Sequence, residues 1–325
     1  MLGERAGVAL PETSMSEEDR KERGIRDRLL EINKIAATYY YRQLRSENGK
    51  AGLAYLKKRE LSDSTINSFG LGYATQSTGN LYKLLKEKGY DDDILKESGL
   101  FTYERGIHEK FWNRVIFPIM DINNKVIGFG GRVMGDAKPK YLNSPETRLF
   151  DKSRNLYGLN IARTSRKPNM IICEGYMDVI SMHQAGFNQA VASLGTALTP
   201  GHARLLKRYT DNVLITYDSD EAGVKAALRA IPLLKEAGLS TKVINMRPYK
   251  DPDEFIKAMG AEAFQERIDN AENSFMYEIG TMLRNYDRGD PESETAFERE
   301  VAAKLVTFKE KLERDNYLKA VCRQF

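Results

Sequence analysis

Asn212-Val-Leu-Ile-Thr-Tyr-Asp-Ser-Asp-Glu-Ala-Gly223 is an apolar run that ends abruptly in two carboxylates. Its residues from Val213 to Tyr217 are mostly β-branched, aliphatic or aromatic, which predicts a short buried strand. Asp218 and Asp220 then lie at the carboxyl end of this strand. In an open α/β sheet, ligands bind at that end because loops and helix N-termini converge there. Two carboxylates so placed repel each other unless a cation lies between them, so this stretch predicts both a sheet and a cation site.

Two other stretches repeat this arrangement of an apolar run followed by acids. Met170-Ile-Ile-Cys-Glu-Gly-Tyr-Met-Asp178 contains Glu174 at the end of its apolar run and Asp178 four residues later. The run at residues 241–246 is followed by Asp251-Pro-Asp-Glu254. Three strand ends therefore each carry carboxylate oxygens, the ligands that hard cations such as Mg²⁺ prefer.

Helix capping is the structural alternative for each acid considered alone. Asp220 is a suitable N-cap for a helix that begins near Glu221, and Glu174 or Asp178 would complement the helix dipole in a first turn. Because three acidic strand ends occur in one repeating βα array, we favour a shared cation site over three unrelated caps.

From residue 169 the apolar pattern alternates between strands and helices. Strands are expected at residues 169–174, 190–194, 212–218 and 241–246, and helices at 175–182, 200–209 and 222–237. This alternation predicts an α/β fold with a mainly parallel sheet flanked by helices on both faces. Beyond Asp253, helices are expected at residues 254–259, 263–285 and 294–325, with a break at 287–293.

The preceding part predicts a mixed α/β subdomain, which makes the chain α+β overall. Residues 17–46 carry apolar side chains at helical spacing, and residues 114–121 and 125–133 predict a β-hairpin. Glycines at 128, 130 and 131 allow close approach of a neighbouring strand or a ligand. We expect a mixed subdomain at 1–168, a metal-binding subdomain at 169–258 and a helical subdomain at 259–325.

A basic loop follows the hairpin. Residues 138–147 combine Lys138, Lys140, Tyr141, Asn143 and Ser144, which suit phosphates through charge and hydrogen bonds and suit a base through stacking. A solvated basic loop is the alternative. Residues 101–168 hold 13 Lys and Arg against 6 Asp and Glu, and Lys152 and Arg154 extend this basic surface. A basic region beside an acidic half predicts a polyanion held over a metal site.

Composition narrows the class of protein further. The 325 residues, 41% of them hydrophobic, suffice for a large core and two or three domains. Cys173 and Cys322 are the two cysteines, too few for a disulfide framework or a structural zinc site, which favours a reducing compartment. The sequence contains no apolar run long enough to span a bilayer and no signal-peptide core, so the cytoplasm is expected.

The acidic motifs resemble those of the TOPRIM fold, which bacterial primases, type IA and type II topoisomerases and some nucleases share. The stretches that carry this resemblance are Glu174-Gly-Tyr-Met-Asp178, Tyr217-Asp-Ser-Asp-Glu-Ala-Gly223 and Asp251-Pro-Asp253. The upstream motifs resemble the basic motif of the bacterial DnaG-type primase, namely Arg114-Val-Ile-Phe-Pro-Ile119, Gly128-Phe-Gly-Gly-Arg132 and Pro139-Lys-Tyr-Leu-Asn-Ser-Pro-Glu-Thr147. The resemblance covers about residues 10–325.

This resemblance implies the RNA-polymerase core of a primase, a monomeric core that acts in the bacterial primosome. It would copy single-stranded DNA into a short RNA primer from NTPs by nucleotidyl transfer, with two or more Mg²⁺ or Mn²⁺ ions. Glu174, Asp218 and Asp220 would be catalytic metal ligands, and Asp178, Asp251 and Asp253 would support them. The residues implied to bind template or NTP phosphates are Arg114, Arg132, Lys138, Lys140, Tyr141, Asn143, Ser144 and Lys152.

The family also implies parts that this sequence lacks. No Cys/His cluster has zinc-ligand spacing, so no zinc is expected in this chain. The sequence stops within a helical pattern, and we expect contacts with the zinc-binding domain and the replicative helicase to involve segments outside it. Two alternatives stay open. A topoisomerase or nuclease would use the same acids, and a non-catalytic single-stranded nucleic-acid-binding protein would use the basic half alone.

Overall fold

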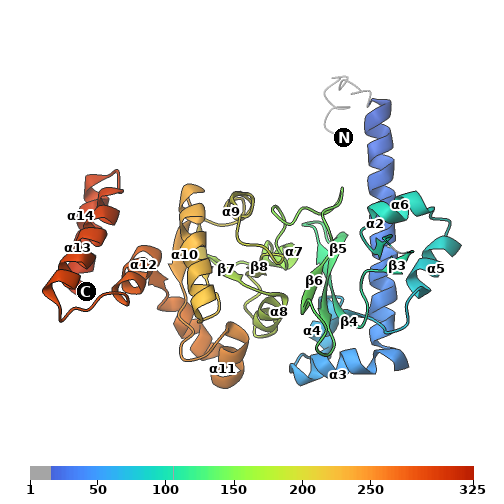
Figure 1. The fold of residues 1–325 in the computed structure, drawn as a ribbon, viewed down its shortest axis with the longest axis horizontal. Coiled ribbons are helices and arrows are strands. Elements are labelled where there is room, and N and C mark those ends of the chain that lie inside the picture. The colour runs from blue at the N-terminus through green and yellow to red at the C-terminus, as the bar shows by residue number, and fades with distance from the viewer. Residues whose placement is uncertain (1–15, 105) are drawn as a thin grey trace, which may run out of the picture. The chain divides into compact units, whose positions relative to one another are not determined.

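The computed structural model describes residues 16–104 and 106–325. The described chain divides into two compact units between Asp151 and Lys152 (Figure 1). This division lies before the expected subdomain boundary at residue 168, because Leu156, Leu159 and Ala162 pack into the core of the second unit.

An antiparallel sheet forms the centre of the first unit. Its strands follow the order β1-β4-β5-β6, with bounds Gly72–Ala74, Arg114–Met120, Val126–Val133 and Tyr141–Asn143. The predicted hairpin is confirmed as β4 and β5, which pair from Arg114↔Val133 to Met120↔Val126. The predicted loop at 138–147 was wrong in part, because β6 lies within it and pairs with the edge of β5.

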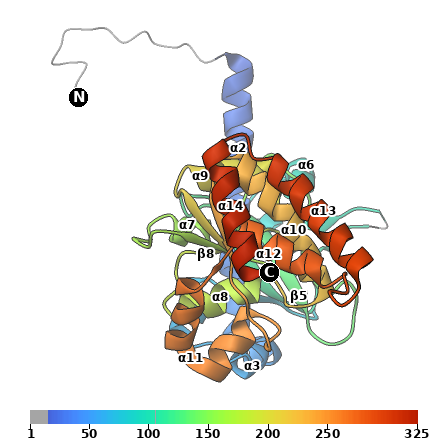
Figure 2. The same ribbon diagram turned by 90° about the vertical axis from the view of Figure 1, so that its left-hand side faces the viewer.

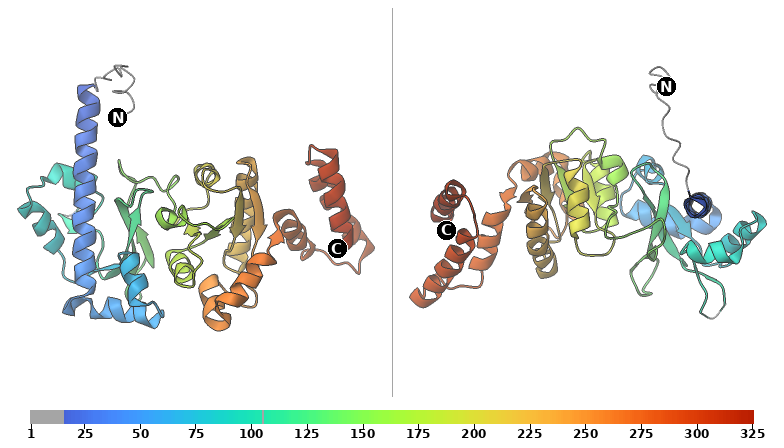
Figure 3. Two further views of the ribbon diagram at one scale, coloured as in Figure 1. Left: turned by 180° about the vertical axis from the view of Figure 1, so that it is seen from behind. Right: turned by 90° about the horizontal axis from the view of Figure 1, so that it is seen from above.

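Helix α2 (Glu17–Leu44) confirms the long helix predicted at the start of the chain and packs against this sheet (Figure 3). Ser16 begins it with a capping box to Asp19. Tyr40 on α2 meets Phe111 and Phe129 edge to face at centroid distances of 6.5 and 5.6 Å. The remaining elements are η1 (Glu47–Gly49), α3 (Lys50–Lys58), α4 (Asp63–Ser68), α5 (Asn80–Glu87), α6 (Asp92–Glu97), β2 (Phe101–Thr102) and β3 (His108–Glu109).

The second unit is the predicted α/β fold. Its sheet has the order β11-β10-β9-β7-β8, with bounds Glu272–Asn273, Ser240–Val243, Asn212–Ile215, Met170–Cys173 and Ala190–Ala192. All neighbours pair in parallel except β11, which runs antiparallel to β10. The prediction of a mainly parallel sheet is therefore confirmed.

Helices cover both faces of this sheet. One face packs against α7 (Leu159–Ala162), α9 (Pro200–Lys207) and α10 (Glu221–Glu236). The other face meets α8 (Tyr176–Gln184), where Sγ of Cys173 lies 3.3 Å from Sδ of Met182. Side chains therefore alternate between two buried faces along β7, as its continuous apolar sequence predicts.

The C-terminal part corrects one predicted helix. Residues 263–285 do not form one helix, because β11 separates α11 (Pro252–Asp269) from α12 (Ser274–Leu283). Asn273 pairs with Lys242 of β10 and caps α12 through Phe275 N–H. Helices α13 (Pro291–Val306) and α14 (Lys311–Gln324) lie side by side (Figure 2). No described helix combines the length and apolar character needed to cross a membrane.

Candidate active site

Glu174 and Asp218 follow two adjacent parallel strands. Glu174 comes directly after β7, and Asp218 follows β9, whose Ile215 pairs with Ile172 of β7. The backbone N–H of Asp218 donates a 2.9 Å hydrogen bond to Oε1 of Glu174. The register of the sheet therefore brings two of the predicted catalytic acids together at one edge.

The turn between Asp218 and the start of α10 is unusually tight. Oδ1 of Asp220 accepts a 2.9 Å hydrogen bond from Gly223 N–H and so caps the helix. A Cβ atom at Gly223 would lie 2.1 Å from the carbonyl oxygen of Asp218, a distance that real Cβ contacts do not show. The absence of a side chain at Gly223 lets the helix start beside Asp218.

Asp178 and Asp251 also act as local capping groups. Oδ2 of Asp178 accepts a 3.0 Å bond from Gly175 N–H, and Oδ1 of Asp251 accepts a 2.8 Å bond from Glu254 N–H. The capping alternative thus holds for Asp178, and Asp251 caps its own helix in the same way, but each uses one oxygen only. Within the described chain, the second oxygen of either carboxylate forms no hydrogen bond.

Burial raises the pKa values of three of the acids, and the neighbouring carboxylates add to the rise. Burial, followed by the charges of Asp251 and Asp218, raises the pKa of Asp178 to about 8. Burial also raises the pKa values of Glu174 and Asp218, and Asp218 is raised although Nζ of Lys250 lies 3.2 Å from its Oδ2. The effect of burial on the pKa of Asp218 therefore exceeds the opposing effect of Lys250.

Asp253 has a different environment from the other acids. It is 3% exposed and accepts a hydrogen bond from Oγ of Ser181, and Nζ of Lys257 lies 3.0 Å from its carboxylate. The Ser181 contact joins α11 to α8, and Lys257 lies on α11 itself, so the carboxylate is engaged within the fold.

The donor set suits a divalent cation in its chemistry. It consists of hard oxygen atoms at a partly buried sheet edge where negative charge is only partly compensated. Across residues 16–104 and 106–325, no three His, Cys, Asp or Glu side chains are arranged as a preformed metal shell. Glu174 and Asp218 are the best placed to hold a metal, with the second oxygens of Asp178, Asp220 and Asp251 nearby in the same turns.

The basic residues of the first unit divide into two groups. Lys138 and Lys140 are exposed and form no ion pair with described residues, and Tyr141 is 37% exposed. The guanidinium of Arg132 lies 4.3 Å from the ring centroid of Tyr55. These side chains are available to an anion or a base from solvent.

Arg114 and Ser144 belong to the second group, whose side chains hold the sheet together. Arg114 is buried and its Nη1 donates to the carbonyl oxygens of Gly131 and Pro139 at 3.1 and 3.0 Å. Burial lowers the pKa of Arg114. Oγ of Ser144 accepts a 3.0 Å bond from Phe129 N–H. In their present positions, neither side chain faces a ligand from solvent.

Two further residues of the predicted basic set, Asn143 and Lys152, belong to neither group. Asn143 is half-buried in β6. Lys152 belongs to the second compact unit, where its carbonyl oxygen accepts a 2.7 Å contact from Nε2 of His202.

Lys250 belongs to this site but was not predicted from the sequence. Its ammonium group pairs with Asp218, and its carbonyl oxygen accepts a 2.8 Å bond from Ser219 N–H, which joins the second and third acidic turns. The signal was its position immediately before Asp251, but the sequence does not show which turn a flexible lysine reaches.

Comparison with known proteins agrees with this arrangement. Residues 39–163 match the DNA primase catalytic core N-terminal domain, and residues 171–256 match a Toprim-like domain. The DNA primase of Clostridium acetobutylicum is 45% identical over 297 residues, which are 91% of this chain and 49% of that protein. The chain therefore spans about half the length of this curated relative.

Solved structures of catalytic cores match over almost their whole length. The DnaG primase catalytic domain bound to single-stranded DNA is 33% identical, with a TM-score of 0.79 over 90% of this chain and 94% of that one. The RNA polymerase domain of Mycobacterium tuberculosis primase DnaG is 29% identical, with a TM-score of 0.82 over 91% and 98%.

Proposed function

Because the chain belongs to the DnaG-type DNA primase family as a catalytic core, we propose that it synthesises short RNA primers on single-stranded DNA from NTPs. The observation that carries this proposal is the junction of Glu174 and Asp218 at the ends of β7 and β9. The matching structure with single-stranded DNA supports a single-stranded template for this chain. We place this activity at the replication fork in the bacterial cytoplasm.

The acidic edge would position the reacting groups. Glu174 and Asp218 would hold one divalent metal, and Asp218 and Asp220 a second, with Asp178 and Asp251 in support. Such ions lower the pKa of the attacking 3′-hydroxyl and stabilise the leaving pyrophosphate. Lys250 opposes the rise that burial causes in the pKa of Asp218, and Gly223 would keep the turn short enough for both aspartates to reach the same site.

The exposed cations of the first unit would bind phosphates of the template or the NTP. Lys138 and Lys140 supply charge, and Tyr141 offers a ring on which a base stacks. Arg114 would act indirectly, because its guanidinium holds the carbonyl oxygen of Pro139 between these lysines. A zinc-binding domain and the replicative helicase would be its partners; the Aquifex aeolicus primase structure contains zinc-binding and RNA polymerase domains together.

Primer synthesis by Asp218→Asn tests the proposal. RNA products from NTPs on a single-stranded DNA template should fall to background, because the shared metal ligand loses its charge. Asp211→Asn is the matched control, since Asp211 lies at the opposite end of β9 in a surface pair with Lys207. Near-normal synthesis by the Asp218 variant would reject the assignment, and metal-dependent DNA cleavage without RNA synthesis would favour a nuclease.

A further inference from the structure

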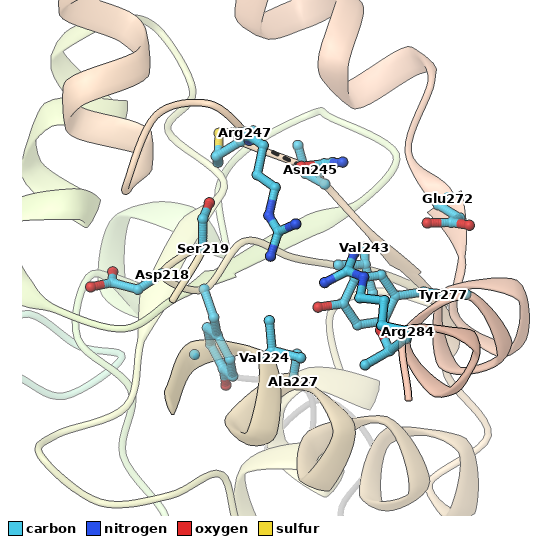
Figure 4. A pocket seen from close by; sticks show the side chains of 16 residues that line it. Asp218, Ser219, Val224, Ala227, Val243, Asn245, Arg247, Glu272, Tyr277 and Arg284 are labelled. Carbon is cyan, nitrogen blue, oxygen red and sulfur yellow. Dashed lines mark hydrogen bonds between the residues drawn. The ribbon is translucent and has the colours of Figure 1, made fainter. Parts of the chain in front are cut away.

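A cavity of about 160 Å³ lies within the second unit, beside the acidic edge (Figure 4). Its floor is apolar and comes from α10 and β10, through Val224, Ala227 and Val243. Its polar lining comes from the turn after β9, the segment after β10, and β11 with α12: Ser219, Asn245, Arg247, Glu272, Tyr277 and Arg284. Asp218 of the acidic edge also borders the cavity, whereas none of these six polar residues belongs to the acidic set or the basic loop.

Two arginines of this lining have no charge partner. Neither Arg247 nor Arg284 forms a side-chain hydrogen bond or an ion pair with any residue of the described chain. Figure 4 shows the Arg247 side chain extending into the cavity and the Arg284 side chain beside Tyr277. Burial raises the pKa of Tyr277, while the charges of both arginines act to lower it, so both lie near the same hydroxyl.

Neither of the two acids that line the cavity forms an ion pair with these arginines. Glu272 accepts a 3.3 Å hydrogen bond from Nε2 of Gln324. The Asp218 carboxylate pairs with Lys250 and points away from Arg247 (Figure 4). The cavity therefore presents two unpaired guanidinium groups, which suit phosphate oxygens because their donors form a rigid planar fork.

The volume of the cavity limits the size of the anion. The cavity has a volume of about 160 Å³. Drug-sized ligands occupy pockets of about 300–1,000 Å³. One or two phosphate groups fit this space.

We propose that Arg247 and Arg284 form a diphosphate-binding pocket that receives the pyrophosphate released beside Asp218. This assignment to pyrophosphate rests on the proposed nucleotidyl transfer. In that reaction the bond between the α- and β-phosphates breaks, and the β- and γ-phosphates leave together as pyrophosphate. The Asp218–Ser219 turn borders the cavity, so the leaving anion moves from the acidic edge to an adjacent cationic site.

Calorimetric titration of the chain with inorganic pyrophosphate in metal-free buffer tests the pocket directly. Arg247→Gln and Arg284→Gln should each weaken binding by about tenfold, since each removes a charge-assisted hydrogen bond. Arg299→Gln is the matched control, because Arg299 is an exposed arginine on α13 outside this cavity. Thermal melting of each variant confirms that it is folded. Equal affinity in all four proteins, or no binding by the unaltered chain, would overturn the proposal.

Two further experiments distinguish this pocket from other phosphate-binding sites. A single-stranded oligonucleotide without terminal phosphates should not displace pyrophosphate; displacement that depends on Arg247 and Arg284 would assign the pocket to a nucleic-acid backbone instead. Glu174→Gln should lose primer synthesis yet keep pyrophosphate affinity, because Glu174 does not line this cavity. Normal synthesis by Glu174→Gln would reject the active-site assignment alone, and unchanged pyrophosphate binding by the arginine variants would reject the pocket alone.

Discussion

The backbone N–H of Asp218 donates a 2.9 Å hydrogen bond to Oε1 of Glu174 and so joins the carboxyl ends of β9 and β7. The side-chain carboxylate of Asp218 pairs with Lys250, which lies in the third acidic turn. Three turns that are far apart in sequence are thereby joined at one edge of the sheet. The geometry of this edge depends on the backbone as much as on the acidic side chains.

Gly223→Ala tests that dependence on the backbone. The new Cβ would lie 2.1 Å from the carbonyl oxygen of Asp218, so the turn or the start of α10 must move. We expect primer synthesis to fall by at least about tenfold, with a loss of stability of about 1–3 kcal/mol. Gly24→Ala is the control, because a Cβ there meets no atom within 4 Å. Full activity of the Gly223 variant would show that the close turn is not required.

Asp253→Asn should lower the free energy of unfolding more than Asp218→Asn does. The Asp253 carboxylate is buried and bonded to Ser181 and Lys257, so its neutral replacement leaves a charged lysine poorly compensated. We expect a loss of about 1–3 kcal/mol in the free energy of unfolding, measured by urea denaturation. An Asp253 variant as stable as the unaltered chain, but unable to bind metal, would place this residue among the metal ligands instead.

Lys138→Ala and Lys140→Ala test the basic loop. If each lysine contacts one phosphate of single-stranded DNA, each variant should reduce the slope of log affinity against log salt by about 0.7. Lys58→Ala is a suitable control because Lys58 is exposed in the same unit and forms no ion pair with described residues. Fluorescence anisotropy over a salt series gives the slopes. Identical slopes in all three variants would show that the loop is only solvated surface.

His183 predicts a pH dependence of stability. Burial lowers the pKa of His183 below its ordinary 6.5, although its Nε2 lies 2.8 Å from the carbonyl oxygen of Ala190. The unfolded chain therefore binds this proton more readily than the folded chain does. The contribution of neutral His183 is fully present above pH 6.5 and decreases as the pH falls through that value. His183→Gln should flatten the pH profile of the unfolding free energy below pH 6.5, and an unchanged profile would contradict this assignment.

The strand ends that carry Glu174 and Asp218 could be predicted from the sequence because their signals were local. An apolar run that ends in Asp218 indicates a strand end, and parallel pairing then brings the end of β7 beside it. The roles of single side chains depended on tertiary contacts and could not be predicted. Arg114 follows the same basic pattern as Arg132, yet one is buried against carbonyl oxygens and the other lies over Tyr55.

Tertiary pairing also explains the errors in secondary structure. β6 is a three-residue strand in a polar segment, and pairing with β5 stabilises it more than its own propensity does. β11 interrupts a helical pattern because Asn273 and Glu272 pair with β10. Of the glycines at the hairpin, Gly131 makes room for the ring of Phe111, whose Cδ1 would lie 2.7 Å from an added Cβ. Close approach was expected there, but the sequence did not identify the neighbour.

Mn²⁺ binding measured by electron paramagnetic resonance tests the central claim most directly. Titration of the chain with Mn²⁺, without NTP, reports free ion and so counts the ions bound by the protein without depending on catalysis. We predict saturable binding by the unaltered chain and by Asp211→Asn, and a loss of at least about tenfold in affinity for Glu174→Gln and Asp218→Asn. Equal Mn²⁺ affinity in all four proteins would contradict the assignment of this sheet edge as the metal site.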